Sequence, residues 1–315
     1  MIFYKNRPIL ACAVLLYLAM SIHAISAQED TDDTMDLLSE LDQIQDYKPQ
    51  PVIATFKSTR ILATQSIERV QKDQLHFRIS HLFGAMDGVS NLFGLDQLNN
   101  MHFSFEYGLT DAIQFGFFRS NKPDVLYALT GKYSIARQTI GDKGSFPLSI
   151  SFYTELDIVT SQLFPEQRDR NFTGRLTYLN QILVARKINT EFSLQLSPTW
   201  VHRNLTTDPL DPNDVFALAV GGRYSVSRST SVNIDYVYTL PTFERYNPKA
   251  NGLVVGIDVE TGGHVFQLFV TNASSLNIAQ LALNQNQAFG MNNIRFGFSM
   301  LREFSVGKKS EKVEE

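Results

Sequence analysis

Apolar side chains occur at every second position along most of this chain. Phe77 and Ile79, for example, alternate with Arg78 and Ser80. A period of two is typical of a β-strand with one apolar face, whereas a helix repeats every ~3.6 residues. We find twelve stretches of this kind between residues 75 and 300. The sequence therefore predicts an all-β protein with about twelve strands.

The connections between these stretches alternate in length. Four of them, at 110–111, 187–191, 227–230 and 261–263, are short enough to be hairpin turns. The connections between them are longer, and only 136–144 is of medium length where a short turn is expected. Outer-membrane barrels combine short periplasmic turns, long external loops and an even strand number. The pattern predicts a transmembrane up-and-down antiparallel β-barrel with both termini on the short-turn side.

The polar face of the predicted strands carries charged residues. A barrel of about twelve strands would leave a lumen too wide for an apolar filling. A charge in a wet interior costs little, while a charge on the lipid-facing wall costs about 2–4 kcal/mol. We therefore expect the apolar face to contact lipid and prefer this interpretation to a soluble sandwich or barrel. Twelve charged residues are then expected to line the lumen: Arg78, Glu106, Lys132, Glu155, Asp157, Arg175, Arg203, Arg223, Asp235, Asp258, Glu260 and Arg295.

These lumenal charges balance, because six of the twelve residues are basic and six are acidic. A strongly ion-selective pore usually shows a ring or stripe of one sign. Two interpretations stay open: ion pairs that hold the strands in register and occlude the lumen, or a mixed-polarity pathway for a solute. We expect Arg223 and Arg295 to be paired across strands, with Glu106 and Glu260 as the nearest acids. The two glycines before Arg223 leave room for its side chain to cross the lumen.

The chain begins with a targeting pattern. Two basic residues precede an apolar run from Ile9 to Ile22, which is followed by the small residues of 24–27. Such a segment is a secretory signal peptide, and we expect it to span 1–27. The single cysteine, Cys12, lies inside it. No second apolar run recurs, so a bundle of membrane-spanning helices, each of ~20 apolar residues, is excluded.

Three further segments flank the predicted barrel at 75–304. Residues 28–51 form an acidic leader and linker, with eight acidic and no basic residues between 28 and 47. The leader is a solvated tether or a docking peptide for a periplasmic partner. Residues 52–74 are apolar and basic by turns and contain no glycine; we expect them to fold against or into the periplasmic mouth as a plug or lid. Residues 305–315 form a charged C-terminal tail.

Candidate chemical sites are few. His102 and Ser104 share a strand face, but it is the lumenal face, where a lipid-acting nucleophile would not meet its substrate. His264 lies on the apolar face near a turn, without a serine nucleophile beside it. The histidines after residue 27 form no pair with metal-binding spacing. We expect no catalytic residue, no metal, no cofactor, no enzymatic activity and no nucleic-acid partner.

Several longer segments carry a resemblance to a known family. They are FKSTRI (56–61), LHFRISH (75–81), NLFGLD (91–96), FEYG (105–108), VARK (184–187), PTWVHRN (198–204), GGRY (221–224), DVETGGHVFQ (258–267) and IRFGF (294–298). With them the chain resembles a family of outer-membrane β-barrels from Bacteroidetes-type bacteria, a domain of unknown function. The resemblance implies a barrel in the cell outer membrane and implies no activity.

The expected partners are the lipid bilayer and the outer-membrane assembly machinery. That machinery usually reads an aromatic residue at the end of a barrel, and here Phe304 is followed by the tail 305–315. Three functions are ranked. A passive pore or transporter of unknown solute comes first. A non-catalytic structural or docking barrel, with an occluded lumen that anchors a periplasmic or surface partner, follows closely. A lipid-acting enzyme comes last.

Overall fold

The computed structural model describes residues 49–121, 125–141, 144–160, 171–206, 211–241, 251–283 and 293–306. The chain divides into two compact units, Met1–Tyr47 and Lys48–Glu315, and all described residues belong to the second. The predicted signal peptide 1–27, the leader up to residue 48 and the tail after residue 306 lie outside the described residues.

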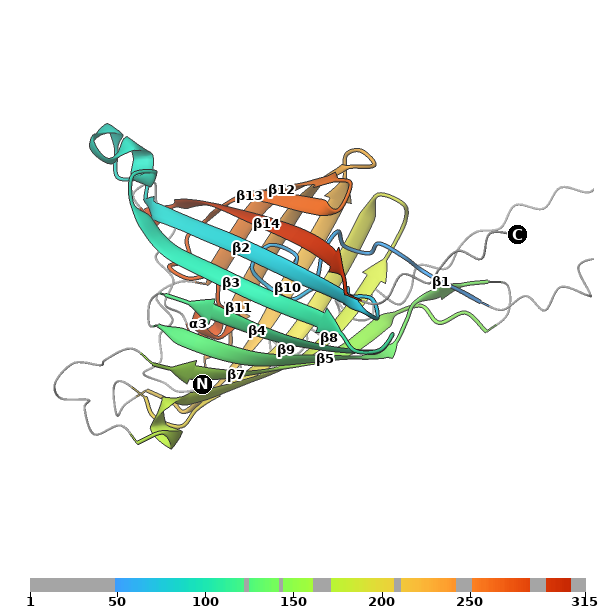
Figure 1. Cartoon of the computed structure of the whole chain (residues 1–315), viewed down its shortest axis with the longest axis horizontal. Coiled ribbons are helices and arrows are strands. Elements are labelled where there is room, and N and C mark those ends of the chain that lie inside the picture. Colours follow the sequence, from blue (N-terminus) through green and yellow to red (C-terminus); the bar gives the residue numbers. More distant parts are fainter. Residues whose placement is uncertain are drawn as a thin grey trace, which may run out of the picture. The chain divides into compact units, whose positions relative to one another are not determined.

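Twelve antiparallel strands close into a barrel (Figure 1), as the alternating pattern predicts. Each strand pairs with its neighbours along the chain, and the last strand pairs with the first of the barrel. The strands are β2 (Gln74–Ala85), β3 (Leu98–Gly108), β4 (Ile113–Ser120), β5 (Leu126–Ala136), β7 (Ser149–Val159), β8 (Leu176–Lys187), β9 (Phe192–Arg203), β10 (Asp214–Ser225), β11 (Thr230–Thr239), β12 (Gly252–Thr261), β13 (His264–Thr271) and β14 (Arg295–Ser305).

The two ends of the barrel differ in their connections. We call the end with the short hairpins the turn end, and the opposite end, with the longer connections, the loop end. β2 begins and β14 finishes at the turn end. There the longer connection between β5 and β7 contains β6 (Thr139–Ile140), which pairs with β1 (Gln50–Pro51). The connection at 136–144 is therefore longer than a hairpin turn because its strand β6 pairs with β1, in the part of the chain that leads into the barrel.

The outer face of the barrel is an apolar belt. On β4, for example, the outward Phe115 and Phe117 are exposed while the inward Gln114 is buried. The belt continues around the barrel through exposed side chains on other strands, including Phe105, Leu129, Phe152, Ile182, Trp200, Phe216, Ile234, Ile257, Phe266 and Leu268. Lipid can solvate such a surface, whereas water cannot do so without cost.

Helical structure is short and confined to connections. Among the described residues it consists of η1 (Val89–Gly94), η3 (Thr173–Arg175) and α3 (Ile278–Ala282). Within the described parts of the chain, no helix is long and apolar enough to cross a membrane.

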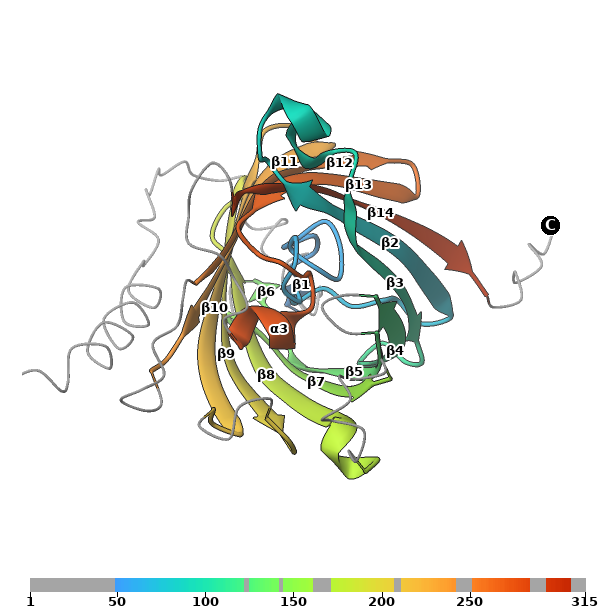
Figure 2. The same ribbon diagram turned by 90° about the vertical axis from the view of Figure 1, so that its left-hand side faces the viewer.

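The interior of the barrel is filled by two chain segments (Figure 2). Residues 54–70, which we call the inner segment, lead into the barrel from the turn end, and residues 272–283, the loop segment, lead in from the loop end. Inward apolar side chains of the wall, such as Leu179, Leu183 and Val215, form one buried cluster with side chains of both segments. The expectation that twelve strands leave no apolar interior is wrong, because these two segments fill the width that wall side chains alone cannot.

Candidate functional site

The predicted lumenal charges differ in depth. Eight of the twelve are buried on the inward face of their strands: Arg78, Glu106, Lys132, Glu155, Asp157, Arg223, Asp235 and Asp258. Arg175, Arg203 and Arg295 are partly exposed at the loop end, and Glu260 is exposed at the turn end. The deep set contains three basic and five acidic residues, so the sign balance of the whole group does not hold in the middle of the barrel.

The expected ion pairs between strands do not form. In the described parts of the chain, none of the ion pairs joins two of the twelve charged wall residues. Arg223 donates to the carbonyl oxygens of Ala54 and Thr55, at 2.8 and 3.1 Å. Arg295 donates to the carbonyl oxygens of Ala273 and Asn293, both at 3.3 Å. The prediction is wrong because chain segments inside the barrel offer backbone acceptors closer than the opposite wall.

The acids that were expected to pair with these arginines also turn to the inner segment. Glu106 accepts a hydrogen bond from the hydroxyl of Thr59, and Glu260 pairs with the ammonium group of Lys57. Both partners belong to the inner segment. The charged residues of the wall are thus arranged around residues 54–70 rather than around one another.

Asp235 on β11 binds the tip of the inner segment. One oxygen of its buried carboxylate accepts the backbone N–H groups of Leu62, Ala63 and Thr64, at 3.0, 2.9 and 3.0 Å. The other oxygen accepts the Thr64 hydroxyl at 2.7 Å. The chain turns tightly here, since the Ile61 N–H donates to the Thr64 carbonyl at 2.9 Å. A carboxylate that accepts several N–H groups is well solvated by the protein, which explains how the charge is buried.

Ile61 fills a gap in the wall beside this turn. A Cβ atom on Gly221 would lie 2.1 Å from the Cδ1 atom of Ile61, so Ile61 would have to shift to admit a side chain there. The glycine was expected to leave room for Arg223 to cross the lumen. Instead, the room receives an apolar side chain of the inner segment, which fixes the depth of the tip.

Wall side chains on other strands bind the rest of the inner segment, mostly through its backbone. Lys132 Nζ on β5 donates to the carbonyl oxygens of Thr59, Ser66 and Glu68, at 3.3, 3.0 and 2.8 Å. The carbonyl oxygen of Ile61 accepts from Gln267 at 2.6 Å. Further contacts come from Gln195 to the Gln65 carbonyl, from the Val70 N–H to Gln114, and from Arg78 to the hydroxyls of Ser58 and Thr59. Strands around the whole barrel thus hold the segment.

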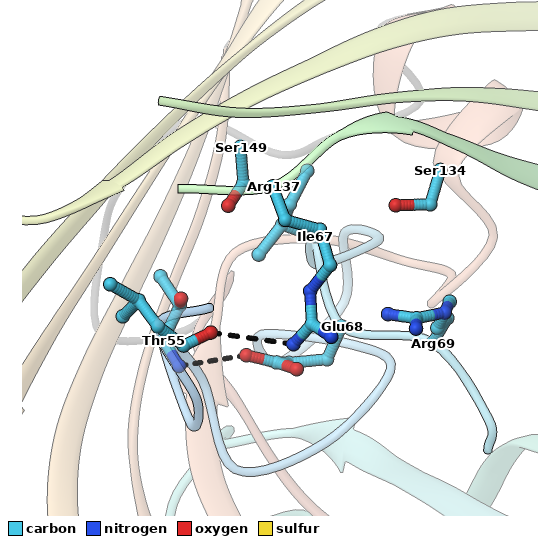
Figure 3. A pocket seen from close by; sticks show the side chains of 8 residues that line it. Thr55, Ile67, Glu68, Arg69, Ser134, Arg137 and Ser149 are labelled. Carbon is cyan, nitrogen blue, oxygen red and sulfur yellow. Dashed lines mark hydrogen bonds between the residues drawn. The ribbon is translucent and has the colours of Figure 1, made fainter. Parts of the chain in front are cut away.

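Figure 3 shows the side chains that meet around the base of the inner segment. Glu68 accepts the N–H groups of Thr55 and Phe56 at 2.7 and 3.2 Å, and Arg137 donates to the Val52 carbonyl at 3.3 Å. Burial, together with the nearby Arg137, lowers the pKa of the Arg69 guanidinium, and Glu68 opposes this shift. The cavity between these side chains has a volume of about 10 Å³, enough for about one water molecule. The base is closely packed.

The loop segment is held differently. Leu276, Ile278 and Leu281 are buried in the apolar cluster of the interior. The Asn277 side chain caps α3 by accepting the Gln280 N–H at 2.9 Å. Its amide also donates to Glu155 at 3.0 Å and to Asp157 at 3.4 Å, which binds the helix to β7. The Thr239 hydroxyl on β11 donates to the Ala282 carbonyl at 2.8 Å, and Arg295 donates to the Ala273 carbonyl. Apolar packing and a smaller set of hydrogen bonds thus hold the segment against the wall.

His102 and Ser104 lie buried on β3, at the positions considered for a nucleophile pair. The His102 ring stacks on Phe118 at 4.5 Å. Among the described residues, neither its ring nitrogens nor the Ser104 hydroxyl has a hydrogen-bond partner. His264 stacks on Phe266 on the outer face, at 6.0 Å. The described residues contain no group of three or more potential metal ligands.

The sequence reasoning missed several residues of this arrangement. Gln114, Gln195 and Gln267 are uncharged, so a prediction based on lumenal charges does not include them. The loop segment was assigned to an external loop. One signal was available, because residues 271–294 contain no Asp, Glu, Lys or Arg. So long a loop without a charged residue indicates burial rather than exposure to water.

Comparison with known proteins gives a family. The family model described as "Membrane bound beta barrel domain (DUF5777)" matches residues 56–304. A search of curated proteins finds no match. Among solved structures, the KdgM porin is similar at a TM-score of 0.46 and 8% identity, covering 73% of this chain and 99% of that one. An outer-membrane channel from Pseudomonas putida F1 is similar at 0.42 and 12% identity, covering 76% and 98%.

The family match and the geometry of the wall agree on location. The matched family is membrane-bound. The barrel is closed, has an even number of strands and carries an apolar belt outside. These are the features of barrels in the outer membrane, where closure leaves no strand edge unpaired in lipid. The described barrel therefore lies in the outer membrane with its belt against the lipid bilayer.

Proposed function

This chain belongs to the DUF5777 family of membrane-bound β-barrel domains, and from that premise we propose that it is an outer-membrane pore closed by its own inner segment. The pore conducts when residues 54–70 leave the interior. One observation carries the proposal: hydrogen bonds from wall side chains, directed mainly to its backbone, hold the segment. Water can replace such bonds, and each contributes only about 0.5–1.5 kcal/mol, or about 1.5–3 kcal/mol where one partner is charged.

The wall that the inner segment would uncover suits a polar solute. Arg78, Glu106, Lys132, Asp235 and Asp258 would line a hydrated path, together with the glutamines at 114, 195 and 267. Because the deep charges are mostly acidic, the open pore would favour cations weakly. The basic residues Arg175, Arg203 and Arg295 at the loop end would reduce that preference. The solutes are then small and hydrophilic, and we assign no catalytic role to the wall.

A second candidate is a permanently occluded barrel that anchors a partner. It is favoured by the loop segment, which apolar packing holds inside the barrel and which water would not displace. In either case the acidic leader 28–51 continues directly into the inner segment. A periplasmic partner that binds the leader would thus be attached to the inner segment through the chain itself. Insertion by the outer-membrane assembly machinery stays a prediction.

Single-channel recording with urea distinguishes the two candidates. The refolded full chain, in a planar bilayer, is expected to be closed in buffer. Conductance steps should appear at urea concentrations below those at which the barrel loses its faster migration on an unboiled gel. Asp235→Asn should lower the urea concentration needed. Ser231→Ala, an inward change on the same strand whose hydroxyl makes no hydrogen bond to the described residues, should not. If no step appears before the barrel itself unfolds, the occluded barrel is the better account.

A further inference from the structure

The connection between β2 and β3 presents an apolar tip at the rim of the loop end. Val89, Leu92 and Phe93 are 77%, 57% and 51% exposed, and Leu95 and Leu98 are exposed as well. No basic residue occurs between 86 and 98. The segment NLFGLD (91–96), noted in the sequence, lies here, and the pore does not use it. We call residues 89–95 the rim finger.

The rim finger is a built structure. The Asn91 amide donates to the Ala85 carbonyl at 3.3 Å, and its side-chain oxygen accepts the Gly94 N–H at 3.1 Å. Gly94 has φ of 86°, and a Cβ atom there would lie 2.4 Å from the Gly84 carbonyl oxygen. The finger is therefore fastened to the end of β2 through its polar residue and its glycine. This leaves the apolar residues between them on the outside.

The backbone at the tip is strained in order to present these side chains. Leu92 and Phe93 have φ values of 49° and 54°, in the left-handed region that residues other than glycine rarely adopt. Such conformations cost energy and persist where the surroundings impose them, often at sites with a function. Hydrogen bonds within the turn hold this conformation, such as the one from the Phe93 N–H to the Gly88 carbonyl at 3.0 Å, and the two large apolar side chains stay exposed.

The position of the rim finger indicates which partner covers it. η1 stands beyond the loop end of β2 and β3 and turns away from the barrel axis in both views (Figures 1 and 2). The lipid-facing belt reaches the same place, because Phe83 on β2 stacks on Phe296 of β14 at 5.9 Å. Leu98, at the start of β3, pairs with Phe83 across the two strands and is exposed. The lipid-facing belt thus reaches the ends of the two strands that carry the finger.

We propose that the rim finger inserts Leu92 and Phe93 into the lipid leaflet at the loop end and anchors that rim of the barrel in the membrane. The partner is the bilayer itself, at the boundary between head groups and acyl chains. Large apolar side chains on a short amphipathic element gain free energy there, while its polar residues stay hydrated. Asp87 and Asp96, on the two sides of the finger, mark where the chain returns to water. The inference does not depend on whether the barrel conducts.

Lipid quenching of a single tryptophan tests this anchor. Trp200→Phe removes the one native tryptophan, and Phe93→Trp then places the probe at the tip. Ser227→Trp, in the exposed β10–β11 turn at the opposite end, is the matched control. Each full-length variant is reconstituted in vesicles of phosphatidylcholine with brominated acyl chains. We expect blue-shifted emission and strong quenching by brominated lipid for the probe at 93, and strong quenching by aqueous iodide for the probe at 227.

A second change separates insertion from other kinds of burial. Leu92→Asn keeps a residue that tolerates positive φ but removes the apolar side chain. It should reduce the lipid quenching of the probe at 93 several-fold while the barrel stays folded on an unboiled gel. Iodide quenching of the probe at 93 equal to that at 227 would place the tip in water and overturn the proposal. A third outcome is blue-shifted emission that brominated lipid does not quench but that depends on the protein-to-lipid ratio. It would show that the tip contacts a second copy of the chain, and this result would overturn the proposal as well.

Discussion

Two segments fill this barrel from opposite ends, and they differ in the balance of polar and apolar contact that holds them. Polar wall side chains on many strands bind the inner segment, and most of these bonds are directed at its backbone. The loop segment buries Leu276, Ile278 and Leu281 and makes fewer hydrogen bonds to the wall, among them those of Asn277 and of the Ala282 carbonyl. The inner segment buries apolar side chains in the same cluster, so it is distinguished by the number of bonds that water can replace.

This difference assigns different tasks to the two segments. Burial of one Leu or Ile side chain contributes about 1.5–3 kcal/mol and is lost as a whole when the segment leaves. A hydrogen bond exchanged for one to water costs far less, provided that the wall becomes hydrated at the same time. We therefore expect the loop segment to be a fixed part of the barrel and the inner segment to be its movable closure.

The largest effect is expected for Leu281→Ala. The side chain is buried in the loop segment, and its truncation should lower the free energy of unfolding by about 3 kcal/mol through lost burial and a residual cavity. Urea unfolding of the barrel in vesicles measures this change. Leu268→Ala, the same change on the lipid-facing side of β13, should cost less. Conductance should stay absent, and an open channel in Leu281→Ala would give the loop segment the role assigned here to the inner one.

Asp235→Ala should weaken the closure without weakening the barrel. Three backbone N–H groups and one hydroxyl lose their acceptor, at a cost of about 2 kcal/mol to retention of the inner segment. Trypsin cleavage after Lys57 or Arg60 measures how often the segment leaves. The rate should rise well above that of Ser231→Ala. Equal rates in the two variants would mean that the carboxylate does not hold the tip.

Lys132→Met should also weaken retention of the inner segment, by a smaller amount of about 1.5 kcal/mol. The reason is that the three carbonyl oxygens that it releases can bind water once the segment moves. Lys57→Met, at the turn end, should cost still less, since its partner Glu260 is about half exposed and the pair is partly screened. Trypsin cleavage after Arg60, a site that both variants keep, ranks the two. A larger effect at Lys57 would place the main attachment at the rim rather than deep in the barrel.

Glu68→Gln should weaken retention of the inner segment least, by roughly 0.5 kcal/mol. The amide oxygen can still accept the N–H groups of Thr55 and Phe56, but the negative charge beside Arg69 and Arg137 is lost. The difference from the unchanged chain should shrink at high salt, which screens the repulsion between the two guanidinium groups. Cleavage rates at low and high salt measure it, with Glu191→Gln on an exposed turn as the control. A difference that persists at high salt would point to lost hydrogen bonds instead.

The strands could be predicted because their information is local. The alternation of Phe115 and Phe117 with Gln114 predicts which side chains face outward. The short connections predict which strands pair with each other. The partners of the inward charges could not be predicted in this way. That Ile61 would fill the gap at Gly221, or that Asp235 would bind three successive N–H groups, depends on contacts between residues more than 150 positions apart. No spacing along one strand encodes such contacts.

The same limit affects expectations about single positions on the inner face. Sequence alternation places Gly297 on the inner side of β14, where a large side chain would be tolerated if the side were wet. A Cβ atom there would lie 2.3 Å from the Phe269 ring, so the position is closely packed. Residues 52–74, by contrast, were separated from both the linker and the strands by composition alone. Composition can thus show that a segment is unusual, but not which wall residues receive it.

The central claim, that residues 54–70 close a pore, is tested most directly by the conductance of a chain without them. The full chain and a variant lacking 54–70, both shown to be folded by faster migration on an unboiled gel, are recorded as single channels in planar bilayers. The account predicts that the full chain is closed in buffer, and that the shortened chain conducts steadily with a weak preference for cations. A shortened barrel that is folded but silent would contradict it, and so would a full chain that conducts as well as the shortened one.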